Sequence, residues 1–282
     1  MNPVVVGKVS VGKGHPPALI AGPCVIESYD LLVETASCIR ELARQFGFPY
    51  ILKSSFEKAN RTAKDSFRGP GLQAGLEMLS RARREVGVPI LTDVHLPDQV
   101  SAAARVVDCL QIPAFLCRQT ELIEAAARTN LPLNIKKGQF MAPGAMQHAV
   151  EKAHSAGSGG VLLTERGTSF GYGDLVVDMR SLLLMSDFGV PVIFDATHSV
   201  QKPAGGSSTS GERRFVAPLA WAAAATGAVD GIFLEVHPDP SRALSDAGSQ
   251  LPLEQLAELL ERLRRIFQAA GRFTHATGGT TK

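Results

Sequence analysis

The sequence predicts a single (β/α)8 TIM barrel over residues 1–282, and two observations carry the prediction. Eight apolar runs alternate with segments of helical periodicity without an internal break, which favours one closed barrel over a doubly wound sheet. Each run is continuously apolar, as expected of strands that are covered on both faces. The runs are ALIAGPC, YILKSS, PILTDVH, CLQIPAF, PLNIKKG, VLLTERG, VPVIFDATH and GIFLEVHP.

The segments between the runs are predicted to be helices. After the first run, Ser28 is a candidate N-cap, apolar residues follow at helical spacing, and Gly47 supplies a stop. The second helix has the same design, with apolar residues from Leu72 to Val86. The other helices are expected over 98–107, 121–129, 145–156, 175–188, 216–226 and 253–270.

Three segments are predicted to lie outside the barrel wall. Residues 1–17 alternate loosely and contain turn glycines, so we expect an N-terminal β-hairpin that caps the bottom of the barrel. The loop 201–213 is rich in glycine and serine and is expected to act as a mobile lid. The tail 274–282 is small and polar, and we expect it to be disordered.

The composition excludes several classes of protein. A formal net charge of +2 argues against a nucleic-acid or membrane partner. No apolar stretch approaches the roughly 20 residues of a membrane helix, and the start of the chain lacks the apolar core of a signal peptide. Four cysteines without a dense framework predict a reducing, cytoplasmic location.

Reactive side chains follow the apolar runs. Because the carboxyl ends of parallel barrel strands meet at one rim, these residues are expected to share a site. In chain order they are Cys24, Lys53, Asp93, Arg118, Lys136, Arg166, His198 and Glu235.

Four of these positions predict a metal site. Cys24, His198, Glu235 and Asp246 come from the first, seventh and eighth strands and the loop after the eighth, which are neighbours in a closed barrel. Thiolate, imidazole and carboxylate ligands suit Zn²⁺, Fe²⁺ or Mn²⁺, which polarise a carbonyl oxygen. The alternative is a buried cysteine and a hydrogen-bonded core histidine. Two further histidines near strand ends compete for the ligand role, His95 and His237.

An excess of cations on the same rim predicts an anion site. A cation directly after an apolar strand requires an anionic partner, and phosphates and carboxylates suit both arginine and lysine. The number of cations implies two phosphates, or a phosphate and a carboxylate, unless ion pairs with Glu57, Asp93, Glu165 or Asp195 absorb them. The cations are Lys53, Lys58, Arg61, Arg118, Lys136, Lys137 and Arg166.

Two polar features near these cations suit a phosphosugar. The loop residues Asn60, Arg61 and Thr62 make a candidate phosphate cradle. Asp93 is placed to accept hydrogen bonds from sugar hydroxyls, and its alternative role is a capping or salt-bridging carboxylate.

Eight motifs occur in order from Ala18 to the last helix: AGPCVIES, KSSFEKANRT, TDVH, QIPAFLCRQT, NIKKGQF, ERGTSFGYGDLVVDMR, DATHSVQ and FLEVHPDPSRALSDAGSQLPL. Together they resemble the 3-deoxy-D-manno-octulosonate 8-phosphate (KDO 8-phosphate) synthase family. The resemblance implies a transferase that condenses phosphoenolpyruvate with D-arabinose 5-phosphate and water. The implied products are KDO 8-phosphate and inorganic phosphate, for lipopolysaccharide biosynthesis.

The resemblance also implies residue roles and a homotetramer. Phosphoenolpyruvate would be held by Lys58, Lys136 and Arg166, helped by Lys53, Gln111 and Ala114. Arabinose 5-phosphate would be held by Asn60, Arg61, Thr62 and Asp93, and by Arg118 reaching into a neighbouring subunit. The residues implied in catalysis are Lys58, Lys136, His198 and Asp246.

Cys24 and the Ser-Asp-Ala around Asp246 resemble the metal-dependent class of the family, whereas the metal-independent class has Asn at the position of Cys24.

Three stretches depart from the family pattern. The pair Thr62-Ala63 stands where Ser-Ser is common, MAPGAMQ lacks a tryptophan, and SSTSGERRF is less glycine-rich. The first and third departures bear on substrate binding and on lid motion.

Three other functions compete with this interpretation. A DAHP synthase would use erythrose 4-phosphate, but that family has a KPR-type sequence where this chain has KANR. A Schiff-base aldolase would use Lys53 or Lys136 as its nucleophile. A non-catalytic phosphosugar-binding barrel would need the cations but not the metal ligands.

Overall fold

The computed structural model describes residues 3–59, 66–170, 173–202 and 210–273. Eight parallel strands form a closed barrel, because β14 pairs with β3 as well as with β11. This confirms the predicted (β/α)8 fold. The strands are β3 (Ala18–Gly22), β4 (Tyr50–Lys53), β5 (Ile90–Asp93), β6 (Cys109–Ile112), β7 (Leu133–Lys136), β8 (Val161–Glu165), β11 (Val192–Asp195) and β14 (Gly231–His237).

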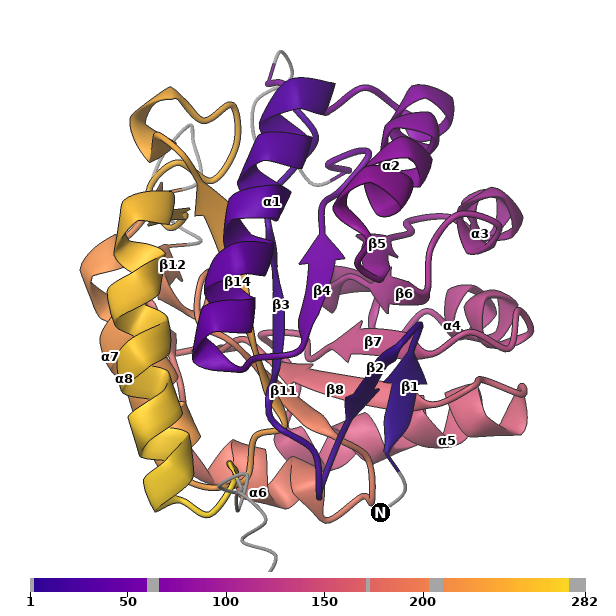
Figure 1. The fold of residues 1–282 in the computed structure, drawn as a ribbon. Helices are drawn as coiled ribbons and strands as arrows, with labels where there is room; N and C mark the ends of the chain where they lie inside the picture. The colour runs from indigo at the N-terminus through magenta and orange to yellow at the C-terminus, as the bar shows by residue number, and fades with distance from the viewer. Residues whose placement is uncertain (1–2, 60–65, 171–172, 203–209, 274–282) are drawn as a thin grey trace, which may run out of the picture.

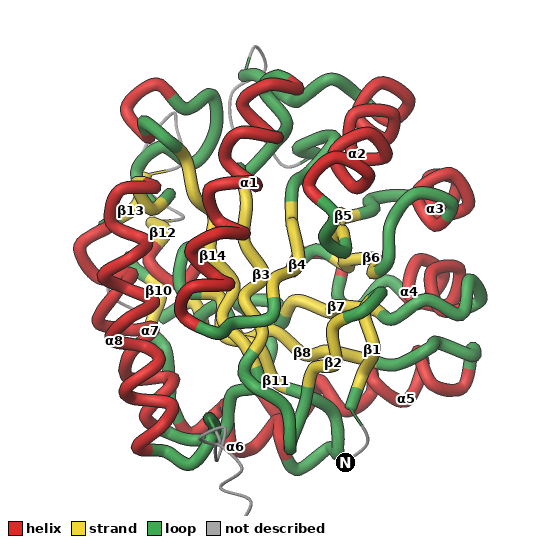
Figure 2. The backbone as a smooth tube through the Cα atoms, in the orientation of Figure 1, coloured by secondary structure: helices red, strands yellow, loops and turns green. Residues whose placement is uncertain are grey.

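The helices surround the strands as an outer layer (Figures 1 and 2). The first helix has the predicted caps: the Ser28 hydroxyl accepts from the Leu31 amide, and Gly47 ends the helix in the left-handed region at φ 78°. The helices are α1 (Tyr29–Phe46), α2 (Leu72–Val86), α3 (Pro97–Ala104), α4 (Thr120–Ala127), α5 (Gln147–Ser155), α6 (Arg180–Ser186), α7 (Val216–Ala225) and α8 (Leu256–Ala269).

One predicted helix is shorter than expected. The sequence indicated a helix over 175–188, but α6 begins only at Arg180. Residues Leu175–Val176 instead form β10, which pairs with β9 (Thr168–Ser169) in the loop after β8. The pairing satisfies the β10 backbone outside a helix, and a β-branched valine fits a strand better than a helix.

The N-terminal hairpin closes the bottom of the barrel, as predicted. It consists of β1 (Val4–Val6) and β2 (Val9–Val11). Its turn residue Gly7 lies against Pro89, which precedes β5. Its buried valines belong to one apolar cluster with inward-facing barrel residues such as Ile20 and Phe233. The second, larger apolar cluster lies between the barrel and the helices.

At the bottom of the barrel, the same hydrogen bond between an aspartate and a backbone amide occurs at two places, and we call each one a brace. Asp108, which precedes β6, accepts from the Ile90 amide at 2.9 Å. Asp230, which precedes β14, accepts from the Val192 amide at 2.9 Å. Both aspartates are buried, so each brace ties the start of one strand to the start of its neighbour. The strands that donate, β5 and β11, both follow the sequence Gly-Val-Pro, at 87–89 and 189–191.

Two short pairings extend the rim opposite the hairpin. The loop after β11 contains β12 (Gln201–Lys202) and β13 (Ser210–Gly211), which pair with each other. The loop after β14 ends in β15 (Leu251–Pro252), which pairs with β14. The expectations of a lid and of a disordered tail rest largely on residues 203–209 and 274–282, which lie outside the described residues. None of the described helices is long and apolar enough to cross a membrane.

Candidate active site

A pocket of about 250 Å³ opens at the carboxyl ends of the barrel strands. Residues from the ends of β4, β5, β6, β7 and β11 line it, as the strand pattern predicts. Charged and amide side chains dominate the lining. The lining residues are Lys53, Lys58, Ala59, Asp93, His95, Gln111, Pro113, Ala114, Phe115, Leu116, Lys136, Gln139, Arg166, Asp195, His198 and Gln201.

The four predicted metal ligands lie beside this pocket. Cys24, Glu235 and Asp246 each offer a ligand atom, and these three atoms lie within 4.8 Å of one another. Cys24 Sγ is 3.6 Å from Asp246 Oδ2. His198 Nε2 is 3.4 Å from Glu235 Oε1 and 3.8 Å from Asp246 Oδ2. The imidazole therefore stands at one edge of the group.

The chemistry of this group fits a divalent cation. Glu235 Oε2 is buried and has no hydrogen-bond partner among the described residues, although buried polar atoms are nearly always satisfied. A cation would supply the missing partner. The donors are one sulfur, one imidazole nitrogen and two carboxylates, the set that Zn²⁺, Fe²⁺ and Mn²⁺ accept.

The loop that carries Asp246 is held against Cys24. Asp246 has a left-handed backbone, at φ 45°, a conformation in which aspartate is enriched among non-glycine residues. The buried Gln250 side chain accepts from the Cys24 amide at 3.4 Å and donates to the Ser245 carbonyl at 2.7 Å. Glu27 accepts from the Leu244 amide at 2.9 Å.

Two lysines from β4 and the loop after it converge on the same carboxylate. Lys53 Nζ is 3.2 Å from Glu235 Oε1, and Lys58 Nζ is 3.4 Å from it. Lys53 is buried and also donates to the Cys24 carbonyl at 3.0 Å. The ends of β4 and β14, the two strands that flank β3, thus pair the predicted cations with a predicted metal ligand.

A second ion pair lies across the pocket. Lys136 ends β7 and pairs with Asp195, which ends β11. The other contact of Asp195 is His198, whose Nδ1 is 2.7 Å from Asp195 Oδ2. The three side chains form a continuous polar chain from the phosphate-binding candidate Lys136 to the metal-ligand candidate His198.

Burial and neighbouring charges have opposing effects on the pKa of each ionisable group in the site. Burial lowers the pKa of Lys136 to about 8, against the attraction of Asp195. Burial alone would raise the pKa of Glu235, but His198, Lys58 and Lys53 outweigh it and hold that pKa well below its usual range.

The thiol and the imidazole have raised pKa values. Burial, Asp246 and Glu235 raise the pKa of Cys24 well above its usual value. For His198, burial lowers the pKa, but Asp195 and Glu235 outweigh it and raise the pKa above the ordinary value. A bound cation reverses this logic at a thiol, so Cys24 would release its proton on binding.

Arg166 has one side of its guanidinium anchored and the other side without a partner. Its Nη2 donates to Gln201 Oε1 at 2.6 Å. Its Nη1 is buried and has no hydrogen-bond partner among the described residues. Because Arg166 lines the pocket, the unsatisfied donor suits an anionic group there.

Asp93 is fixed by two neighbours on the pocket wall. Ser55 Oγ donates to Asp93 Oδ1 at 2.5 Å, and His95 Nε2 is 3.0 Å from Asp93 Oδ2. Burial would raise the pKa of Asp93, but the contact with His95 and the charge of Lys53 outweigh it and lower the pKa far below its usual value. The group is therefore a carboxylate, which accepts hydrogen bonds.

Of five further residues predicted from the sequence, three lie outside the described residues and two, Lys137 and Arg118, do not line this pocket. Asn60, Arg61 and Thr62 lie outside the described residues. Lys137 is fully buried and pairs with Glu165 at 3.3 Å, so it does not face an anion at the rim. Arg118 is exposed and does not line the pocket described above.

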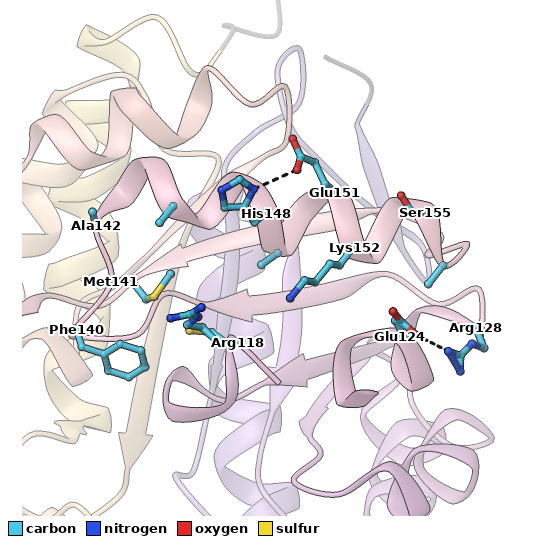
Figure 3. Close-up of a pocket in the computed structure, with 14 residues that line it drawn as sticks. Arg118, Glu124, Arg128, Phe140, Met141, Ala142, His148, Glu151, Lys152 and Ser155 are labelled. Carbon is cyan, nitrogen blue, oxygen red and sulfur yellow. Dashed lines mark hydrogen bonds and ion pairs between the residues drawn. The ribbon is translucent and has the colours of Figure 1, made fainter. Parts of the chain in front are cut away.

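Arg118 instead lines a larger hollow of about 900 Å³ beside α4 and α5. Figure 3 shows it near Phe140 and Met141, with His148 and Lys152 on the helix above. This hollow contains none of the buried ion pairs around Glu235 and Asp195. The smaller pocket is therefore the candidate active site, because desolvated, paired charges are typical of catalytic clefts.

Among the residues of the site that were not predicted from the sequence are two bridging amides. Gln201 and Gln250 each bridge groups from different loops. Neither has a periodicity or charge signal, although both lie within motifs quoted above, DATHSVQ and DAGSQLPL.

The chain is similar to several named proteins. The model of the DAHP synthetase I family matches residues 2–270. A protein of Alkalilimnicola ehrlichii is 54% identical over 259 residues, covering 92% of this chain and 93% of the relative. One from Nitratidesulfovibrio vulgaris is 56% identical over 250 residues, covering 88% and 91%. One from Magnetococcus marinus is 54% identical over 264 residues, covering 93% and 92%. Each of the three is named 2-dehydro-3-deoxyphosphooctonate aldolase.

Proposed function

The chain belongs to the DAHP synthetase I family, and on that premise we propose that it is a 2-dehydro-3-deoxyphosphooctonate aldolase, a KDO 8-phosphate synthase. The reaction condenses phosphoenolpyruvate with D-arabinose 5-phosphate and water, and releases KDO 8-phosphate and phosphate. The single observation that carries the proposal is the pocket that gathers Lys53, Lys58, Lys136 and Arg166 beside Cys24, His198, Glu235 and Asp246.

We assign phosphoenolpyruvate to the cationic side of the pocket. Lys58, Lys136 and Arg166 would neutralise its phosphate and carboxylate, with Lys53 and Gln111 beside them. Ala114, at the start of a short 3-10 turn after β6, contributes its backbone. Arg166 Nη1, which has no hydrogen-bond partner within the described ranges, supports this assignment.

We assign arabinose 5-phosphate to the opposite side. The Asp93 carboxylate would accept from sugar hydroxyls, and Asn60, Arg61 and Thr62 would hold the phosphate. Arg118 would complete the aldose site of a neighbouring subunit in a homotetramer, in accord with its exposure outside its own chain's pocket. Four free cysteines favour a reducing location, which we propose is the cytoplasm.

In the proposed reaction, C3 of phosphoenolpyruvate attacks the aldehyde carbon of the sugar. Positive charge develops at C2, water adds there, and the product loses inorganic phosphate by C–O cleavage. Binding both substrates side by side supplies much of the rate through orientation. Lys58 and Arg166 hold the phosphoenolpyruvate anion, while the chain Lys136–Asp195–His198 can hold or move a proton between the two sides of the pocket.

A divalent cation held by Cys24, His198, Glu235 and Asp246 would supply Lewis-acid polarisation of the aldehyde oxygen. Within this arrangement Asp246 and His198 orient the aldehyde side of the reaction. Lys53 has a different task, because its ammonium is committed to Glu235 and to the Cys24 carbonyl. That commitment argues against Lys53 as a Schiff-base nucleophile.

The choice of aldose tests the proposal directly. Phosphate release from phosphoenolpyruvate should be fast with arabinose 5-phosphate and slow with erythrose 4-phosphate. A preference for erythrose 4-phosphate would make the chain a DAHP synthase, which the names of its relatives do not favour. If the chain releases no phosphate with either sugar, the result favours a non-catalytic phosphosugar-binding barrel.

A further inference from the structure

Gln201 joins the two halves of the candidate active site. It is the first residue of β12 and lines the pocket. Its Oε1 accepts from Arg166 Nη2 at 2.6 Å, and its Nε2 donates to Asp246 Oδ2 at 3.1 Å. Only this orientation of the amide satisfies a guanidinium on one side and a carboxylate on the other.

The two partners of Gln201 serve different ligands in the proposed function. Arg166 Nη1 is buried without a hydrogen-bond partner in the described part of the chain, and the proposed function assigns it to phosphoenolpyruvate. Asp246 contributes one of the three clustered ligand atoms beside the pocket. One side-chain amide therefore stands between the phosphate-binding guanidinium and a metal-binding carboxylate.

We propose that Gln201 is a positioning residue that makes phosphoenolpyruvate binding and metal binding interdependent; this inference rests on the proposed function. A cation fixes the Asp246 carboxylate, the carboxylate orders the Gln201 amide, and the amide fixes Arg166 for the phosphate. Coupling between two sites is reciprocal, so phosphoenolpyruvate also tightens the metal. The charge-neutral amide is suited to this task, because it accepts on one side and donates on the other.

A second connection runs parallel to this one. Lys136, Asp195 and His198 also link the anion side to the metal side. This second connection passes through two charged pairs, whereas the connection through Gln201 passes through one neutral amide. The contribution of Gln201 is therefore the part of the coupling between phosphoenolpyruvate binding and metal binding that is lost when Gln201 is substituted.

The test measures coupling without turnover. Calorimetric titration gives the Kd of phosphoenolpyruvate for the chain stripped of metal and for the chain loaded with Zn²⁺, in the absence of aldose. Zn²⁺ affinity is measured with and without phosphoenolpyruvate, by competition with a chromophoric chelator. In the unmodified chain the two ratios should agree, at about fivefold or more.

Two variants remove the bridge in different ways. Gln201→Met keeps the size of the side chain but neither hydrogen bond, and its coupling ratio should fall to within about twofold of one. Gln201→Glu keeps the acceptor for Arg166 but places a carboxylate against Asp246, so it should weaken coupling even if the methionine variant folds poorly. Gln73→Glu, on the exposed face of α2, is the matched control for an added charge and should leave both ratios unchanged.

The outcomes separate this inference from the proposed function. A Gln201→Met chain that binds both ligands with the unmodified coupling ratio overturns the positioning role. An unmodified chain that binds neither phosphoenolpyruvate nor Zn²⁺ overturns the proposed function, and the inference with it. Thermal unfolding of each variant, followed by circular dichroism, shows whether a lost ratio reflects lost folding.

Discussion

Lys136 illustrates how burial tunes one residue of the site. Its ammonium pairs with Asp195 and lies 3.2 Å from the centre of the Phe233 ring. Burial nevertheless lowers its pKa to about 8, with Lys53 adding to the effect and Asp195 and Glu235 opposing it. The charge that would bind phosphoenolpyruvate is therefore lost just above neutral pH.

We predict that the KM for phosphoenolpyruvate rises above about pH 8, because Lys136 loses its proton there. Lys136→Arg is the control, since a guanidinium stays charged throughout this range. The arginine variant should show a higher KM than the unmodified chain but a flat profile. Initial rates between about pH 7 and 10 measure both. A flat KM in the unmodified chain would remove Lys136 from the anion site.

On the proposed assignment, Cys24 determines whether the activity requires a metal. We predict that a chelator abolishes activity and that Fe²⁺, Zn²⁺ or Mn²⁺ restores it. Loss of a residue that only supports a metal ligand typically lowers metal affinity about 10- to 100-fold. Cys24→Asn replaces a proposed ligand itself, so its metal affinity should fall further. Its residual activity should be weaker and insensitive to chelator. Full activity of the unmodified chain after chelation, with no metal by elemental analysis, would contradict this.

The sequence anticipated the charged residues of the site better than its amides. Cys24, His198, Glu235 and Asp246 stand at strand ends or just beyond, where a barrel concentrates its chemistry. Gln201 and Gln250 have no such signal, because their roles depend on loop geometry. For Lys137 the alternative that the sequence left open holds, because Lys137 pairs with Glu165. Neighbouring residues along a strand face opposite sides, so Lys136 and Lys137 do not both face the pocket.

At the scale of elements, the loops after β7 and β8 are tied together behind the pocket. Lys137 donates to Thr168 Oγ1 at 3.0 Å and to the Gly167 carbonyl at 3.3 Å. Glu165 accepts from the Gly167 amide at 2.7 Å and from Ser181 Oγ at 2.8 Å. These contacts fix the backbone that follows β8 and carries Arg166, so the proposed anion site depends on the Lys137–Glu165 ion pair, which does not line the pocket.

The N-terminal hairpin is an element whose contribution is to stability. Val6 is fully buried in the barrel floor, whereas Val5 on the same strand is 53% exposed. We predict that Val6→Ala lowers the free energy of unfolding by about 2 kcal/mol and leaves kcat/KM unchanged. Val5→Ala is the matched control and should change stability by less than about 0.5 kcal/mol.

Denaturant-induced unfolding measures the hairpin effect. Equal stability of the Val5 and Val6 variants would mean that the hairpin does not support the barrel. The hairpin itself was predictable from its alternation and turn glycines. The true start of α6 was not, because the pairing of β10 with β9 depends on a contact between residues on either side of a loop.

For the whole molecule, the position of Arg118 bears on assembly. Its exposure outside its own pocket agrees with the proposal that it serves a neighbouring subunit. We predict that Arg118→Ala weakens arabinose 5-phosphate binding about tenfold or more. Lys136→Met should be inactive because it removes a cation from the pocket of its own chain.

Mixing the two variants tests whether sites are shared. Subunits of the Lys136→Met chain would donate an intact Arg118 to pockets of the Arg118→Ala chain. Re-formed mixed oligomers should therefore exceed the summed activity of the parents, and sedimentation should give the mass of a tetramer. Activity that only matches the sum would confine Arg118 to its own chain.

The repeated brace at the bottom of the barrel has a consequence at its mouth. The braced strands β5 and β11 are four positions apart in an eight-stranded ring, so they stand on opposite sides of an approximate two-fold axis. Asp93 ends β5 and pairs with His95, and Asp195 ends β11 and pairs with His198. The mouth thus holds an aspartate–histidine pair in each half-barrel. On the proposed assignment, one pair faces the aldose and the other faces the metal and the enol.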